Sequence, residues 1–193
     1  MLTLAIRTQL IIGAALVLLL IVTRGHHFGS LHNLPSASTA VFLLAGLYLR
    51  PLWVFPALLA VAGSLDFAAV TWGGVSNFCV SPSYPLLIPA YAALWFAGRW
   101  YAKRYCFEWR TLLPLIAATL VGAVGCELFS SGGFYFFSGR FVDTTLVEFG
   151  GRFAKYFPGS LQSIAFYIGL TAIVHTIFTL LRGTTNRQQS TPG

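Results

Sequence analysis

The chain has 193 residues, of which 56 % are hydrophobic and only 9 % are charged, and its 12 basic residues outnumber five acidic ones to give a net charge of +7. Soluble domains carry about 25 % charged residues, so this composition excludes a soluble globular domain as well as a disordered chain. Each membrane-spanning helix takes roughly 20 residues, so the length accommodates about six spans and no sizeable soluble domain.

Six apolar segments follow one another along the chain, and we expect each to form a membrane helix. The first, 4–23, is longer than the apolar core of a secretory signal and is closed by Arg24, which favours an uncleaved span. The second and fourth are short for a full crossing, which predicts tilt, extension into their flanks or local thinning of the bilayer. The five later segments are 36–49, 52–72, 84–98, 111–130 and 160–181.

Basic residues at the ends of these segments predict the orientation, because cytoplasmic loops carry an excess of Lys and Arg. Eight lie on the side of the termini: Arg7, Arg50, Arg99, Lys103, Arg104, Arg110, Arg182 and Arg187. Four lie on the opposite side: Arg24, Arg140, Arg152 and Lys155. We therefore expect both termini in the cytoplasm. The placement suits lipid headgroups rather than a basic stripe for nucleic acid, so no nucleic-acid partner is expected.

The predicted fold class is all-α, a six-helix transmembrane bundle over residues 1–182 followed by a disordered cytoplasmic tail, 183–193. The loops predicted to face outward, 25–35, 73–83 and 131–159, hold histidines, a cysteine and many aromatic residues. Loops held by a rigid scaffold concentrate binding residues, so we expect the functional site at the outer face.

Cys79 lies in the second of these loops, between two glycines and the proline-rich start of the next helix. A disulfide is disfavoured, since Cys106 falls in a cytoplasmic loop and Cys126 inside the fifth span. Thiolates are soft metal ligands and good nucleophiles. Three interpretations stay open: a metal ligand, the nucleophile of a membrane thiol enzyme with an outward histidine as base, and a small half-buried residue.

Asp66 and Glu127 are acids inside apolar segments, near the outer ends. An ionisable group at membrane depth is costly and predicts a functional role with a partner. For Asp66 the candidate partners on the outer side are Arg152, Lys155, Arg140 and the Tyr84 hydroxyl. We interpret Asp66 as a group that orients a ligand on the Cys79 loop, and Glu127 as structural.

Three histidines, His26, His27 and His32, fall within seven residues of the first outward loop. Their spacing matches no zinc motif, so we expect one of them to act as a ligand or hydrogen-bonding group. His175, near the inner end of the last segment, is interpreted as a core or interfacial histidine.

The glycine- and aromatic-rich run 132–139 forms either an interfacial belt or a flat cover over a ligand. A cup that offers a thiol, an imidazole, aromatic walls and amide groups suits a large metallated macrocycle better than a simple ion.

The chain combines the six segments, the His26-His27-Phe28 sequence in the first outward loop, and the set Asp66, Cys79, Tyr84 and Arg152. On these features it resembles the BtuM family. These are solitary cobalamin-uptake proteins related to the S-components of energy-coupling-factor transporters. The resemblance covers roughly residues 1–182, and its most specific element is the Cys79 loop with Asp66 before it and Tyr84 after it.

The resemblance implies an S-component-like fold that captures a corrinoid, cobalamin or cobinamide, at the outer face of a bacterial inner membrane. Cys79 would ligate cobalt, His27 would contact or ligate it from the opposite face, and Asp66, Tyr84 and Arg152 would surround it. Displacement of cyanide from cyanocobalamin would be a consequence. The first segment has no clean pair of small residues four apart for packing against an energising module, and the chain has no phosphate-binding loop, so we expect it to act without an ATPase partner and without a nucleotide.

Overall fold

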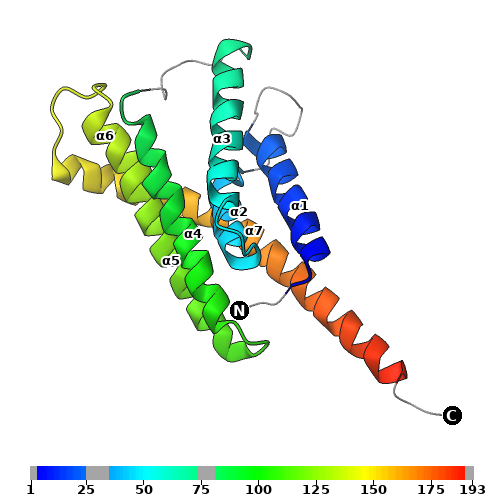
Figure 1. The fold of residues 1–193 in the computed structure, drawn as a ribbon. Coiled ribbons are helices and arrows are strands. Elements are labelled where there is room, and N and C mark those ends of the chain that lie inside the picture. Colours follow the sequence, from blue (N-terminus) through cyan, green and yellow to red (C-terminus); the bar gives the residue numbers. More distant parts are fainter. Residues whose placement is uncertain (1–3, 25–34, 74–80, 190–193) are drawn as a thin grey trace.

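The computed structural model describes residues 4–24, 35–73 and 81–189, with side chains up to residue 179 (Figure 1). Within these ranges the chain is helical and contains no strand. A π-helical turn, Leu128–Gly132, joins the fifth helix to the short sixth. The helices are α1 Ile6–Arg24, α2 Ser38–Tyr48, α3 Val54–Thr71, α4 Leu87–Arg104, α5 Leu112–Glu127, α6 Gly133–Phe137 and α7 Leu146–Gln189.

Four helical stretches are long and apolar enough to cross a membrane: Ile6–Arg24, Val54–Thr71, Trp109–Phe137 and Leu146–Thr179. Large apolar side chains on them, such as Ile11 and Val121, are exposed on the isolated protein, as expected of side chains that face lipid. The predicted all-helical chain with several potential membrane spans is confirmed. Six full crossings remain a prediction, because α2 has only 11 residues and α4 carries three basic residues toward its end.

The short helix α2 is the centre of the bundle. Every residue of Ser38–Tyr48 except Thr39 is buried, and α2 packs chiefly against α4. The two backbones touch, because a Cβ at Gly46 would overlap the carbonyl oxygen of Trp95, and a Cβ at Gly98 would overlap that of Leu43. Glycine is needed at both positions for this close approach.

The outward loop predicted over 131–159 is wrong in its extent, since α6 and the start of α7 lie within it and only 138–145 separate the two helices. The Thr145 side chain caps α7 by accepting a hydrogen bond from the backbone N–H of Glu148 at 3.2 Å. The spacing Thr-x-x-Glu is that of a capping box, a helix-start signal that the sequence carries.

Two other boundaries also differ from the prediction. Helix α4 continues to Arg104 rather than ending at residue 98, and its final turns bury Tyr101 and Ala102. Helix α7 includes Pro158 and continues to Gln189, so residues 183–189, predicted as part of a disordered tail, extend the last helix.

Candidate functional site

An ion pair between Arg24, the last residue of α1, and Asp66, in the last two turns of α3, forms the centre of the candidate site. The Arg24 guanidinium binds Asp66 with two parallel hydrogen bonds, Nε to Oδ1 and Nη2 to Oδ2, both 2.7 Å long. The side chains are 13 % and 26 % exposed. Bidentate pairing is the strongest arrangement available to these two groups, and it explains how a carboxylate is tolerated within an apolar segment.

Three neutral side chains complete this cluster. Arg24 Nη1 donates to Ser38 Oγ at 3.0 Å and to Tyr91 Oη at 2.8 Å. The Tyr84 hydroxyl donates to Asp66 Oδ2 at 2.7 Å. Residues from α1, α2, α3, α4 and the 3-10 turn before α4 therefore share one network, which we call the Arg24–Asp66 network.

The network contains one predicted partner of Asp66 and one that the sequence analysis missed. Tyr84 is among the expected partners, whereas the cation is Arg24 rather than Arg152, Lys155 or Arg140. The sequence pattern assigns Arg24 only the role of closing the first segment. Arg24 and Asp66 both lie near the predicted outer ends of their segments, and this shared membrane level is the one sequence feature that indicates their pairing.

Arg152 lies in a different set of contacts, on α7. It binds Glu148 one turn earlier at 2.9 Å, and its guanidinium carbon lies 4.6 Å from the centre of the Phe141 ring and 5.2 Å from that of Tyr135. The ion pair is exposed and contributes little to stability. A role for Arg152 in binding a ligand remains a prediction.

The Arg24–Asp66 network lies at the ends of both segments that carry the predicted ligands. Cys79, His26, His27 and His32 are outside the described residues. Arg24 directly precedes segment 25–34, and Asp66 and Tyr84 lie on either side of segment 74–80. The hydrogen bond between Tyr84 and Asp66 thus ties together the two ends of the stretch that contains Cys79. Cys79 is five residues from Tyr84, and five residues span at most about 18 Å.

Glu127 is buried at the end of α5 and accepts a hydrogen bond from the Ser131 hydroxyl one turn later. This contact satisfies the carboxyl group within its own helix, in agreement with a structural role. Cys126 is buried and Cys106 is exposed, and both are free thiols. Within the described ranges no group of three His, Cys, Asp or Glu side chains is arranged to hold a metal ion.

No protein-family model matches the sequence, and a search of curated proteins found no relative.

Proposed function

We propose that this protein binds a cobalt corrinoid at the end of the bundle where the Arg24–Asp66 network lies, and takes part in corrinoid uptake across a bacterial inner membrane. The observation that carries the proposal is the network itself, which anchors the ends of the segment with Cys79 and the start of the segment with His27. Two ligand-bearing segments that begin at one rigid cluster are suited to enclosing a large flat guest between them.

In this proposal the Cys79 sulfur donates an electron pair to the cobalt of the substrate. The ligand it replaces, water or cyanide, leaves with its own electron pair, and the thiol proton passes to the departing cyanide or to water, so the exchange needs no oxidant or reductant. A thiolate is a soft, strong donor for such a metal. His27 would contact the opposite face of the macrocycle, and cyanide would be lost from cyanocobalamin on binding.

The roles of the described residues follow from their contacts. Asp66 is neutralised by Arg24, so it acts as a positioning residue that holds Tyr84, and with it the end of the Cys79 segment. Arg152 keeps exposed surface beside Phe141, which would allow its guanidinium to donate to the amide oxygens of a corrinoid rim. Both termini would lie in the cytoplasm, and no energising ATPase partner is required for binding.

The test is purification of the full chain from cells supplied with cobalamin, followed by visible spectroscopy of the protein after gel filtration. We expect a coloured protein with one corrinoid per chain, and a shifted spectrum for Cys79→Ser. Cys106→Ser is the matched control and should leave the spectrum unchanged, because this exposed thiol lies at the opposite end of the bundle.

A well-folded protein that stays colourless would contradict the proposal. If it were instead acylated at Cys79 by thioester substrates, the thiol-enzyme interpretation would replace it. Growth of a cobalamin-dependent strain that lacks its own importer tests transport separately, and failure to restore growth would reduce the proposal to binding alone.

A further inference from the structure

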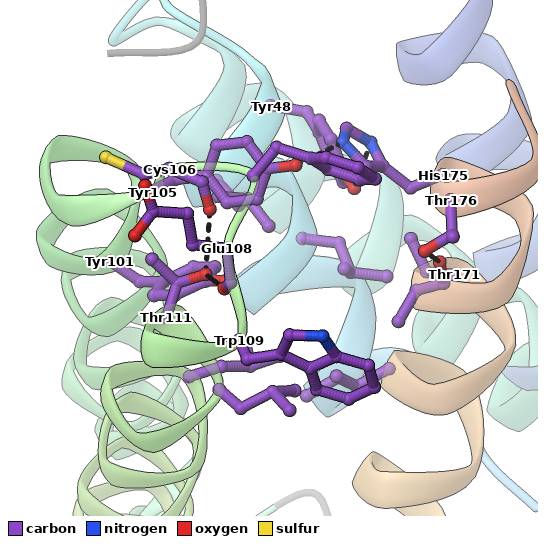
Figure 2. Close-up of a pocket in the computed structure, with 17 residues that line it drawn as sticks. Tyr48, Tyr101, Tyr105, Cys106, Glu108, Trp109, Thr111, Thr171, His175 and Thr176 are labelled. Atoms are coloured by element: carbon purple, nitrogen blue, oxygen red, sulfur yellow. Dashed lines mark hydrogen bonds between the residues drawn. The ribbon is translucent and has the colours of Figure 1, made fainter. Parts of the chain in front are cut away.

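A cavity lies at the other end of the bundle, where the connection between α4 and α5 meets α7 (Figure 2). Its volume is about 330 Å³, within the range of small-molecule pockets. The walls combine aromatic residues of the α4–α5 connection with apolar residues of α2, α5 and α7, and His175 projects from α7 toward Tyr48 and Tyr105. The cavity shares no residue with the Arg24–Asp66 network, so a ligand bound in it would be independent of the proposed corrinoid site.

His175 is held between two phenols that also line the cavity. The Tyr105 hydroxyl lies 2.7 Å from Nε2, and the Tyr48 hydroxyl lies 3.3 Å from Nδ1. A neutral imidazole has one N–H and one acceptor nitrogen, so the three side chains hold three polar hydrogens and make two hydrogen bonds. In either tautomer one phenol O–H is left over, and among the described residues neither phenol has another hydrogen-bond partner.

The left-over O–H is a hydrogen-bond donor at neutral pH whichever phenol carries it, because an ordinary phenol has a pKa near 10. Burial, with a smaller effect of Cys106, raises the pKa of Tyr105 further. A donor that lies on the wall of a mostly apolar cavity and has no partner in the described part of the chain favours a ligand that brings an acceptor oxygen.

The lining also limits the charge and shape of that ligand. Of the described residues around the cavity none is Lys or Arg, and Glu108 is the acid at its rim, so a phosphate or carboxylate group would meet no countercharge. The flat side chains of Tyr101 and Trp109 face the space, and Leu112 and Ile168 close it with apolar surface. Such walls suit a planar, uncharged ring.

We propose that this cavity binds the head group of a quinone, a neutral planar ring whose carbonyl oxygen accepts the left-over phenol hydrogen of the Tyr48–His175–Tyr105 cluster. The exposed Phe107 and Trp109 beside the cavity are the kind of side chains found where a helical bundle meets the membrane surface, which is where an amphiphile of this class enters.

The test is equilibrium dialysis of duroquinone against the full chain in phosphatidylcholine nanodiscs, with empty nanodiscs as background. Duroquinone is fully substituted, so its methyl groups block addition of the Cys106 thiol. Durene is the matched probe, a flat six-membered carbon ring with the same four methyl groups and a C–H in place of each carbonyl. We expect saturable binding of duroquinone at one per chain, and about fivefold to tenfold weaker binding of durene, the difference made by one hydrogen bond.

Two variants separate the hydrogen bond from the cavity. The triple variant Tyr48→Phe/Tyr105→Phe/His175→Phe removes every polar hydrogen of the cluster, so it should reduce the affinity for duroquinone to that for durene and leave the durene affinity unchanged. Ala172→Trp keeps the Tyr48–His175–Tyr105 cluster and fills the cavity, so it should abolish binding of both probes. Tyr156→Phe, on an exposed part of α7, is the control and should change neither.

Equal affinity for the two probes, or duroquinone binding that survives Ala172→Trp, would overturn the proposal. Displacement of duroquinone by dioctanoylglycerol at equal concentration would overturn the assignment to quinones, because a flexible neutral lipid would then fit equally well. Any of these results leaves the corrinoid proposal untouched, because the two sites share no residue.

Discussion

Asp66 and Arg24 depend on each other, because each is a charged group that the apolar bundle tolerates only when paired. Asp66→Asn leaves the Arg24 charge with a neutral amide, and Arg24→Gln leaves the carboxylate without its cation. We expect each single variant to lower the free energy of unfolding by about 2–3 kcal/mol, less than for a fully buried pair because both side chains retain some exposure.

The measurement is reversible unfolding by sodium dodecyl sulfate in mixed micelles, carried through a double-mutant cycle. The variant Arg24→Gln/Asp66→Asn should lose clearly less than the sum of the two single losses, since no unpaired charge remains. Additive losses would show that the two charges are not coupled, and would remove the network as the rigid base of the site.

At the scale of single residues, the sequence indicates which side chains are candidates for function, but it predicts the contacts between them less well. Asp66 stands out because an acid in an apolar segment demands a partner, and the expectation that Tyr84 lies nearby is confirmed. The sequence places Arg24 on the same side of the membrane as Asp66, but it does not single out Arg24 among the cations there, because the two residues are 42 positions apart and their contact depends on how α1 packs beside α3. The pairing of Arg152 was missed for a different reason: it pairs with Glu148 four positions earlier, a local helical contact, and the sequence pattern predicts a loop over these residues.

At the scale of elements, the α2–α4 contact holds the fold together. Gly46 and Gly98 allow backbone to meet backbone, and an added methyl group would collide with a carbonyl oxygen that cannot move without shifting its helix. We expect Gly46→Ala and Gly98→Ala each to cost about 1–3 kcal/mol of unfolding free energy, in spite of the better helix propensity of alanine.

Gly169→Ala is the matched control, because nothing lies within 4 Å of the position that its Cβ would occupy on α7. It should be neutral or stabilising by up to about 1 kcal/mol. The same unfolding assay compares all three variants, and a destabilisation at Gly169 as large as at Gly46 would mean that the loss comes from helix properties and not from the interface.

Helix ends were harder to predict than helix positions. All six apolar segments contain helices, because a backbone surrounded by apolar side chains or lipid has to satisfy its hydrogen bonds within itself. The aromatic and glycine-rich stretch after α5 resembles a loop in composition, yet local signals such as the Thr145 cap start α7 there. Composition averages over a window, whereas a cap acts at one residue.

For the whole molecule, the excess of basic residues on one side predicts that both termini and Cys106 face the cytoplasm, with the connection between α6 and α7 outside. A Val142→Cys variant without native cysteines presents a thiol on that connection, where Val142 is 97 % exposed. A membrane-impermeant maleimide should label this variant on intact cells. A second variant, in which Cys106 is the one remaining cysteine, should be labelled only after the cells are permeabilised. The reverse pattern would place the Arg24–Asp66 network on the cytoplasmic side and contradict capture of a corrinoid from outside.

The claim on which the functional account rests is a bond between sulfur and cobalt, and cobalt K-edge X-ray absorption of the protein purified with cobalamin observes that bond directly. We expect one sulfur scatterer in the first coordination shell of the bound cobalt, retained in Cys106→Ser and lost in Cys79→Ser. A shell of nitrogen and oxygen neighbours alone in the unmodified protein would contradict the account.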